Sequence, residues 1–175
     1  MVTTGIDDCA GGTSAFRVAD DDGGAAEFKE LAVTFTGDGI KSMCFVVREA
    51  DMASSGNQHL SLRDATAPAD LLVLAITGWT DGEPSVTAAA GTYLGKRYIG
   101  NGYWAIYGQT TTVTAANNTR ARITPAVTAA ATGSIDVYRV NAYNDEVPGF
   151  SILTAGDVRN ADTFYADIGF APQNL

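Results

Sequence analysis

The stretch that determines the fold is Ile40-Lys41-Ser42-Met43-Cys44-Phe45-Val46-Val47-Arg48. Its centre, 43–47, is an unbroken apolar run, and it follows the turn-forming triplet Gly37-Asp38-Gly39. The run is too short for a typical helix, and its β-branched and aromatic side chains favour a strand. Because successive side chains of a strand point to opposite faces, this one must be covered on both sides. We therefore expect a central strand in a buried sheet.

Shorter runs of the same kind lie along the chain, separated by turns rich in Gly, Asp, Asn and Pro. Residues 120–124 and 134–140 alternate between apolar and polar, which is typical of antiparallel strands with one wet face. Strands are expected at 32–36, 40–48, 60–63, 71–77, 103–107, 111–115, 120–124 and 134–140. About eight strands without alternating helices predict an all-β antiparallel sandwich of the jelly-roll type.

The length of 175 residues suits one domain. We expect the sandwich at 15–150, flanked by an N-terminal extension at 1–14 and a C-terminal extension at 151–175. The one candidate helix is 156–165, where Asp157 could cap the first turn and Val158, Ala161 and Tyr165 could form an apolar stripe.

The charge and the apolar distribution exclude several classes of protein. The net charge is −9, from 20 acidic and 11 basic side chains, so direct nucleic-acid binding is not expected. No apolar run approaches the roughly 18 residues that membrane insertion requires. The N-terminus lacks the basic and apolar regions of a signal peptide. Cys44 lies in the central apolar run and is expected to be a buried, unreactive thiol.

Four stretches resemble a known family when they are taken in order. They are KSMCFVVR at 41–48, LSLRDAT at 60–66, GYWAI at 102–106 and TGSIDVYRVN at 132–141. The carbohydrate-binding-module-like jelly rolls of tailed-phage virion proteins carry YTFSVYVK, LRLxDxT, GWYRV and tGsvyvwgaQlE in the same order. The chain departs from that pattern at Tyr103-Trp104, where the aromatic pair is inverted, at Ala105, which replaces an arginine, and in lacking the closing Gln-Leu-Glu.

The resemblance implies a jelly roll on the surface of a virion, as a capsid decoration, head-fibre or tail-associated protein. Its partners would be other virion proteins, namely capsid or tail subunits, together with further copies of itself in a homo-oligomer. A host-surface glycan is a further implied ligand. The alternative is a dedicated carbohydrate-binding module that recognises capsule or cell-wall polysaccharide.

Catalytic patterns are missing from the sequence. His59 is the sole histidine, so one chain cannot build a multi-histidine metal site. No serine lies in a G-x-S-x-G elbow, and no glycine-rich loop has the setting of a phosphate site. We expect no enzymatic activity and no required cofactor.

The glycan-binding candidates are Trp79, Tyr93, Tyr98 and Trp104. An exposed aromatic ring can stack on the apolar face of a sugar while nearby polar groups complete hydrogen bonds. The alternative is that these rings belong to the sheet core, and the motif around Trp104 favours packing.

The acidic turn Asp20-Asp21-Asp22-Gly23-Gly24 is the one candidate metal site. Ca²⁺ takes six to eight oxygen ligands, and carboxylates on a flexible turn can supply several of them. Structural calcium is also frequent in jelly rolls of the family that the chain resembles. The alternative is a solvated acidic turn, because the EF-hand pattern is incomplete.

Overall fold

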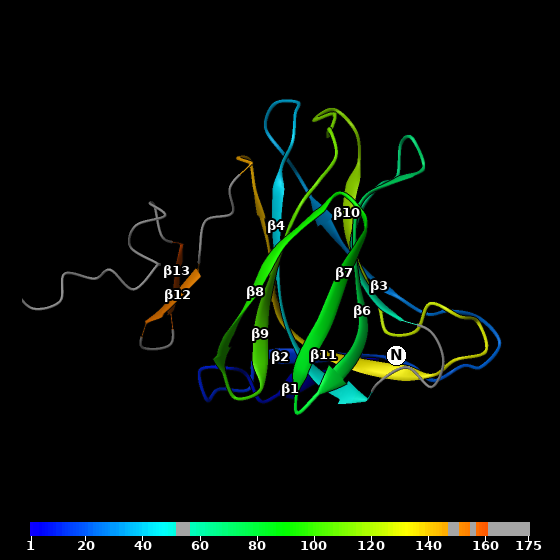
Figure 1. Ribbon diagram of the computed structural model, residues 1–175, viewed down its shortest axis with the longest axis vertical. Helices are drawn as coiled ribbons and strands as arrows, with labels where there is room; N and C mark the ends of the chain where they lie inside the picture. Colours follow the sequence, from blue (N-terminus) through cyan, green and yellow to red (C-terminus); the bar gives the residue numbers. More distant parts are fainter. Residues whose placement is uncertain (52–56, 147–150, 155–156, 161–175) are drawn as a thin grey trace, which may run out of the picture.

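Strand β4 (Ser42–Asp51) has buried side chains on both faces, as the central apolar stretch predicted. Met43, Phe45 and Val47 join the main core, whereas Cys44 and Val46 belong to a second apolar cluster. The computed structural model describes residues 1–51, 57–146, 151–154 and 157–160, and it places β4 near the middle of a sheet (Figure 1).

Two antiparallel sheets pack as a sandwich, which confirms the predicted fold class. The six-stranded sheet has the order β1 (Val2–Ile6), β2 (Ala15–Asp20), β11 (Gly133–Tyr143), β4, β9 (Tyr103–Gln109) and β8 (Thr92–Gly100). The five-stranded sheet has the order β3 (Lys29–Val33), β10 (Thr119–Thr124), β5 (Gln58–Asp64), β6 (Ala69–Thr80) and β7 (Glu83–Ala90). Strands β12 (Ser151–Thr154) and β13 (Asp157–Asn160) form a separate hairpin.

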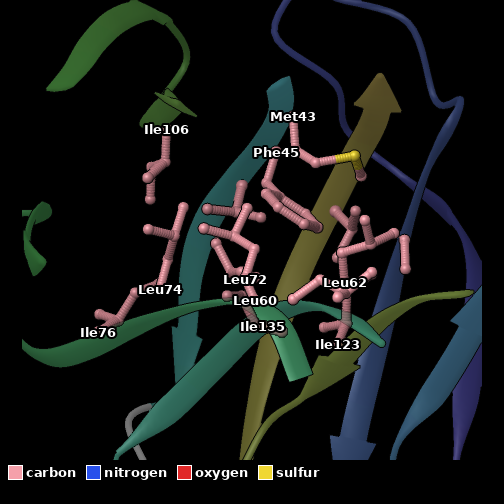
Figure 2. Packing of buried hydrophobic residues seen from close by; sticks show 14 of the residues in the cluster. Met43, Phe45, Leu60, Leu62, Leu72, Leu74, Ile76, Ile106, Ile123 and Ile135 are labelled. Atoms are coloured by element: carbon pink, nitrogen blue, oxygen red, sulfur yellow. The ribbon is translucent and has the colours of Figure 1, made fainter. Parts of the chain in front are cut away.

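The main core fills the space between the two sheets (Figure 2). Phe45, Ile106 and Ile135 enter it from the six-stranded sheet. Leucines and isoleucines of β5, β6 and β10 enter it from the five-stranded sheet, and they include Leu60, Leu62, Leu72, Leu74, Ile76 and Ile123. All of these are fully buried, and each such side chain contributes roughly 1.5–3 kcal/mol through the hydrophobic effect.

The six-stranded sheet is also apolar on its outer face, where Cys44, Val46, Tyr103, Ala105 and Tyr107 are buried. The loop 7–14, between β1 and β2, packs against one end of this face. The Tyr103 hydroxyl donates a hydrogen bond of 2.6 Å to the carbonyl of Asp7, and the Asn101 side-chain amide donates one of 2.8 Å to the carbonyl of Asp8. These contacts hold the loop against the start of β9.

Several strands differ from the sequence prediction, since the sandwich has eleven strands rather than about eight. Four of them, β1, β2, β7 and β8, were not expected, and β1 places part of the predicted N-terminal extension inside the six-stranded sheet. Strand β3 begins and ends three residues before the predicted 32–36. The expected strand at 111–115 is reduced to one bridge between Val113 and Gly39.

The helix expected at 156–165 is wrong where it can be compared. Residues Asp157–Asn160 form β13 and pair with β12, so that Asn160 lies opposite Ser151. Residue 156 and residues 161–165 lie outside the described residues. Within the described ranges, no helix has the length and apolar character needed to span a membrane.

Candidate functional site

The open edges of the two sheets are the first candidates for binding. Strands β1 and β8 end the six-stranded sheet, and β3 and β7 end the five-stranded sheet. An edge strand presents backbone groups that another chain can pair with, so each edge is a potential docking surface unless charges or bulges protect it. Strand β8 stands out because two large apolar side chains on it are exposed, Leu94 at 44% and Tyr98 at 55%.

Tyr98 is the most exposed member of a cluster on β8, β9 and the start of β7 that we call the aromatic corner: Tyr98, Trp104, Lys96 and Glu83. The rings of Tyr98 and Trp104 meet edge to face, with centroids 5.4 Å apart. The Lys96 ammonium lies 5.5 Å from the Trp104 centroid and 2.8 Å from a Glu83 carboxylate oxygen. The sequence placed these residues on different segments, and the β8–β9 register brings Tyr98 directly opposite Trp104.

Hydrogen bonds to the neighbouring turn fix the orientation of the corner. The Trp104 indole donates to the Gly82 carbonyl at 2.8 Å, and the Lys96 ammonium donates to the Pro84 carbonyl. Trp104 also packs against the main core and is half-buried, as the core alternative predicted. The corner therefore presents one exposed ring, that of Tyr98, on a rigid base with an ion pair beside it. Such a surface can stack on a sugar or on a partner's side chain.

The other two aromatic candidates have packing roles. The Trp79 indole donates a hydrogen bond of 2.9 Å to the side-chain oxygen of Gln58, which is fully buried. Tyr93 packs against the main core, and burial, with the Glu83 carboxylate as a smaller cause, raises the pKa of its hydroxyl. The four predicted rings therefore do not form an exposed row. Leu94, which sequence reasoning missed, has a larger exposed fraction, 44%, than either of these two half-buried rings.

The acidic turn does not assemble a metal site among the described residues. Asp20 is buried, and one of its carboxylate oxygens accepts a hydrogen bond from the Glu27 backbone amide at 3.0 Å. Asp22 points a carboxylate oxygen at the Gly24 amide, 2.8 Å away, which closes a local turn. Asp21 is exposed. Within residues 1–51 and 57–146, no three acidic, histidine or cysteine side chains group in a way that could hold a metal ion.

His59 is half-buried on β5, opposite Ala75 on β6 and Thr124 on β10. Burial lowers the pKa of its imidazole, with the Asp70 carboxylate as a weaker opposing influence. The ring is therefore mainly in its neutral form at pH 7.

An ion network around the buried carboxylate of Asp136, on the outer face of the six-stranded sheet, was not predicted. Asp136 on β11 is 1% exposed and accepts hydrogen bonds from Arg17 of β2 at 2.7 Å and from Arg48 of β4 at 2.8 Å. Hydrogen bonding to Asp136 raises the pKa of Arg17. The Arg48 guanidinium also lies 4.7 Å above the Tyr103 ring. Because both arginines donate hydrogen bonds to the same carboxylate, the network links β2, β11 and β4.

In comparisons with known proteins, no protein-family model and no curated protein matches this chain.

Proposed function

We propose that the protein is a non-enzymatic structural and attachment component on the surface of a tailed-phage particle. In this proposal the sandwich binds neighbouring virion subunits through its open sheet edges, and further copies of the chain bind in the same way. On the particle, the protein is a capsid decoration, a head-fibre protein or a tail-associated protein. The resemblance of residues 41–48, 60–66, 102–106 and 132–141 supports the virion setting.

The observation that supports docking is the exposed apolar pair Leu94 and Tyr98 on the unpaired edge of β8. Isolated apolar side chains are common on protein surfaces, but an edge strand adds backbone groups that a partner strand can engage. Lys96 and Glu83 lie beside the pair and can form polar contacts at the rim of an interface. Many copies on one particle would turn weak single contacts into firm attachment.

The test uses particles produced from the genome that encodes this chain. We expect the protein in purified particles by mass spectrometry, and gold-labelled antibody against it should mark one region of the particle. In the double variant Leu94→Lys/Tyr98→Lys, the amount bound per particle should fall several-fold, since each buried lysine adds a desolvation cost. Ile40→Lys is the matched control, because Ile40 is exposed at 36% and lies outside the edge strands.

Two outcomes would contradict the proposal. One is the absence of the protein from purified particles. The other is incorporation that the edge substitutions leave unchanged, in which case the β8 edge is not the docking surface.

A second candidate function, glycan recognition, is favoured by the exposed Tyr98 ring on its rigid base. Binding to capsule or cell-wall polysaccharide on a glycan array should be lost in Tyr98→Ala and kept in Tyr98→Phe, because stacking needs the ring rather than the hydroxyl. Phe28→Ala is the control, since Phe28 is exposed at 49% on another part of the surface. Trp79→Ala would not separate binding from folding, because it removes the hydrogen bond to buried Gln58.

A further inference from the structure

The two sheets leave the sandwich closed on one side and open on the other. On the closed side, only Gly91 separates β7 from β8, and the ion pair of Lys96 and Glu83 joins the two strands. On the open side, β1 ends the six-stranded sheet and β3 ends the five-stranded sheet. Within the described residues, no hydrogen bond or ion pair joins β1 to β3. This side therefore lacks the polar closure that β7 and β8 have.

A groove of about 450 Å³ lies between the two open edges. Its lining comes from three strands: Val2 and Thr4 on β1, Phe16 on β2, and Lys29 and Leu31 on β3. Phe16 and Leu31 also pack against the main core, so the floor of the groove is continuous with that core. Val2 is 44% exposed. The groove is therefore an apolar surface in contact with water, and a partner that filled it would extend the hydrophobic core.

The backbone of β1 has two residues whose polar groups point to the open edge. The Met1 amine donates to the Ala19 carbonyl at 2.6 Å, and the Ala19 amide donates to the Met1 carbonyl at 2.9 Å. Hydrogen-bonded and non-hydrogen-bonded pairs alternate along an antiparallel ladder. Thr3 is therefore the next residue to bond to β2, and the N–H and C=O groups of Val2 and Thr4 point away from β2. The side chains of the same two residues line the groove.

Strand β1 also lacks the charges that usually protect an edge strand. Its sequence, Val-Thr-Thr-Gly-Ile, contains neither a charged residue nor a proline. The other edge strands of the sandwich carry charged side chains, namely Lys29 and Glu30 on β3, Glu83 on β7, and Lys96 and Arg97 on β8. A bulge between Thr4 and Ile6 limits regular pairing to residues 2–4. Because charges and prolines keep edges from pairing with other chains, these uncharged residues favour the addition of a strand.

Lys29 gives the groove a positive charge. It is half-buried, and in the part of the chain that the structure describes its ammonium group has neither a hydrogen bond nor an ion pair. The adjacent Glu30 carboxylate accepts hydrogen bonds from Arg120 and Arg122 instead. The other residues that line the groove are uncharged. An uncompensated ammonium group beside an apolar groove favours a partner that brings a carboxylate.

We propose that an extended segment of another protein pairs with the open edge of β1, fills the groove with apolar side chains at alternate positions, and places an acidic side chain against Lys29. This inference depends neither on the virion role nor on docking at β8. A second copy of the chain matches the groove less well, because its β1 brings no carboxylate and its own Lys29 adds a like charge. A fatty acid supplies a carboxylate but leaves the backbone groups of Val2 and Thr4 unpaired.

A phage-displayed library of random decapeptides, selected on the immobilised full chain, identifies the preferred segment. We expect the enriched sequences to alternate apolar and polar residues and to share one aspartate or glutamate. A synthetic peptide of the consensus should bind in fluorescence anisotropy, and Lys29→Glu should weaken its binding about tenfold or more. Replacing the acid of the peptide with lysine should restore binding to Lys29→Glu. Arg63→Glu is the matched control, since it makes the same change of charge on β5, inside the five-stranded sheet.

Thr4→Pro separates strand pairing from simple filling of the groove. Proline removes the N–H that points to the open edge and leaves the bonds between β1 and β2 in place, so the far-UV circular dichroism should not change. Binding of the consensus peptide should fall about tenfold or more. Failure to enrich acidic sequences, or unchanged binding to either Lys29→Glu or Thr4→Pro, would overturn the proposal. Dimers of the wild type that Thr4→Pro abolishes in sedimentation would assign the edge to a second copy and overturn it as well.

Discussion

Asp8 organises the loop 7–14 with a single carboxylate. One of its oxygens accepts hydrogen bonds from the amides of Ala10 and Gly12, each at 2.9 Å, and the other accepts from the Ser14 hydroxyl at 2.5 Å. Asp8→Asn should lower the free energy of unfolding by about 1–3 kcal/mol, because hydrogen bonds to a charged acceptor are replaced by weaker or mismatched ones. Urea unfolding measures the change. Asp7→Asn is the control, since the Asp7 side chain is exposed and only its carbonyl is used.

The same carboxylate gives a dependence on pH. The Ser14 hydrogen bond is the largest of the causes that lower the pKa of Asp8 from 3.8 to about 2. A group whose pKa is lowered by folding stabilises the fold above its unfolded pKa, so this contribution is complete above about pH 4 and is lost as the pH falls toward 2. Between pH 4 and 2 the wild type should therefore lose more stability than Asp8→Asn. Parallel losses in urea titrations across this range would contradict the assignment.

At the residue scale the sequence identified burial better than it identified sites. The core role of residues 43–47 follows from an unbroken apolar run, and the packing role of Trp104 follows from its place in a motif. Which aromatic ring is exposed depends on the β8–β9 register, since Tyr98 and Trp104 are six residues apart in sequence and directly opposite in the sheet. The partners of Asp136 could not be predicted either, because Arg17 is 119 residues away.

Among the elements, the crossing from β7 to β8 depends on Gly91. This residue has a φ of +69°, and a Cβ there would lie 2.4 Å from the Gln109 carbonyl oxygen. Gly91→Ala should destabilise the fold by more than the roughly 1–2 kcal/mol of left-handed strain alone, because the backbone must also move. Gly82→Ala is the matched control: its φ is +77° and its Cβ would meet nothing within 4 Å. Equal losses in thermal unfolding would show that the close approach is unimportant.

Asp136 holds three neighbouring strands together, since its two arginine partners come from β2 and β4. Asp136→Ala should cost about 1–3 kcal/mol, because the side chains of Arg17 and Arg48, 39% and 23% exposed, lose a charged hydrogen-bond acceptor but remain in contact with water. The exposed pair of Arg63 and Asp70, 3.6 Å apart, is the comparison, and Asp70→Ala should cost less than about 1 kcal/mol. Chemical denaturation of both variants measures the difference. A loss at Asp136 as small as that at Asp70 would contradict the role given to the network.

Three of the four strands that the sequence missed, β1, β7 and β8, are edge strands and share a physical cause. An edge strand is paired on one side and half covered, so it needs few apolar residues and shows weak alternation. β7 is rich in Ala, Ser and Thr, and β8 contains Gly95, Lys96 and Arg97 within its span. β2 is different, because Phe16 and Val18 alternate with Arg17 and gave a usable signal. The predicted strand at 111–115 has the right residue types but pairs only at Val113.

For the whole molecule, one core shared by two sheets predicts one unfolding transition. Trp79 on β6 and Trp104 on β9 both pack against the main core, and they report on the two different sheets. In the single-tryptophan variants Trp79→Phe and Trp104→Phe, the remaining fluorescence should change at the same urea concentration as the far-UV circular dichroism of that variant. Separate midpoints for the two probes would mean that the sheets unfold independently.

The order of strands within each sheet has a consequence for synthesis on the ribosome. β11 lies between β2 and β4, and β10 lies between β3 and β5, so late strands fill gaps that early strands leave open. Until β10 and β11 have been synthesised, neither sheet is complete. The apolar faces of β4 and β5 therefore remain partly exposed to solvent. At ordinary translation rates of about 5–20 residues per second, this exposed interval lasts several seconds. The nascent chain is therefore a natural client for chaperones until residue 143 has cleared the exit tunnel.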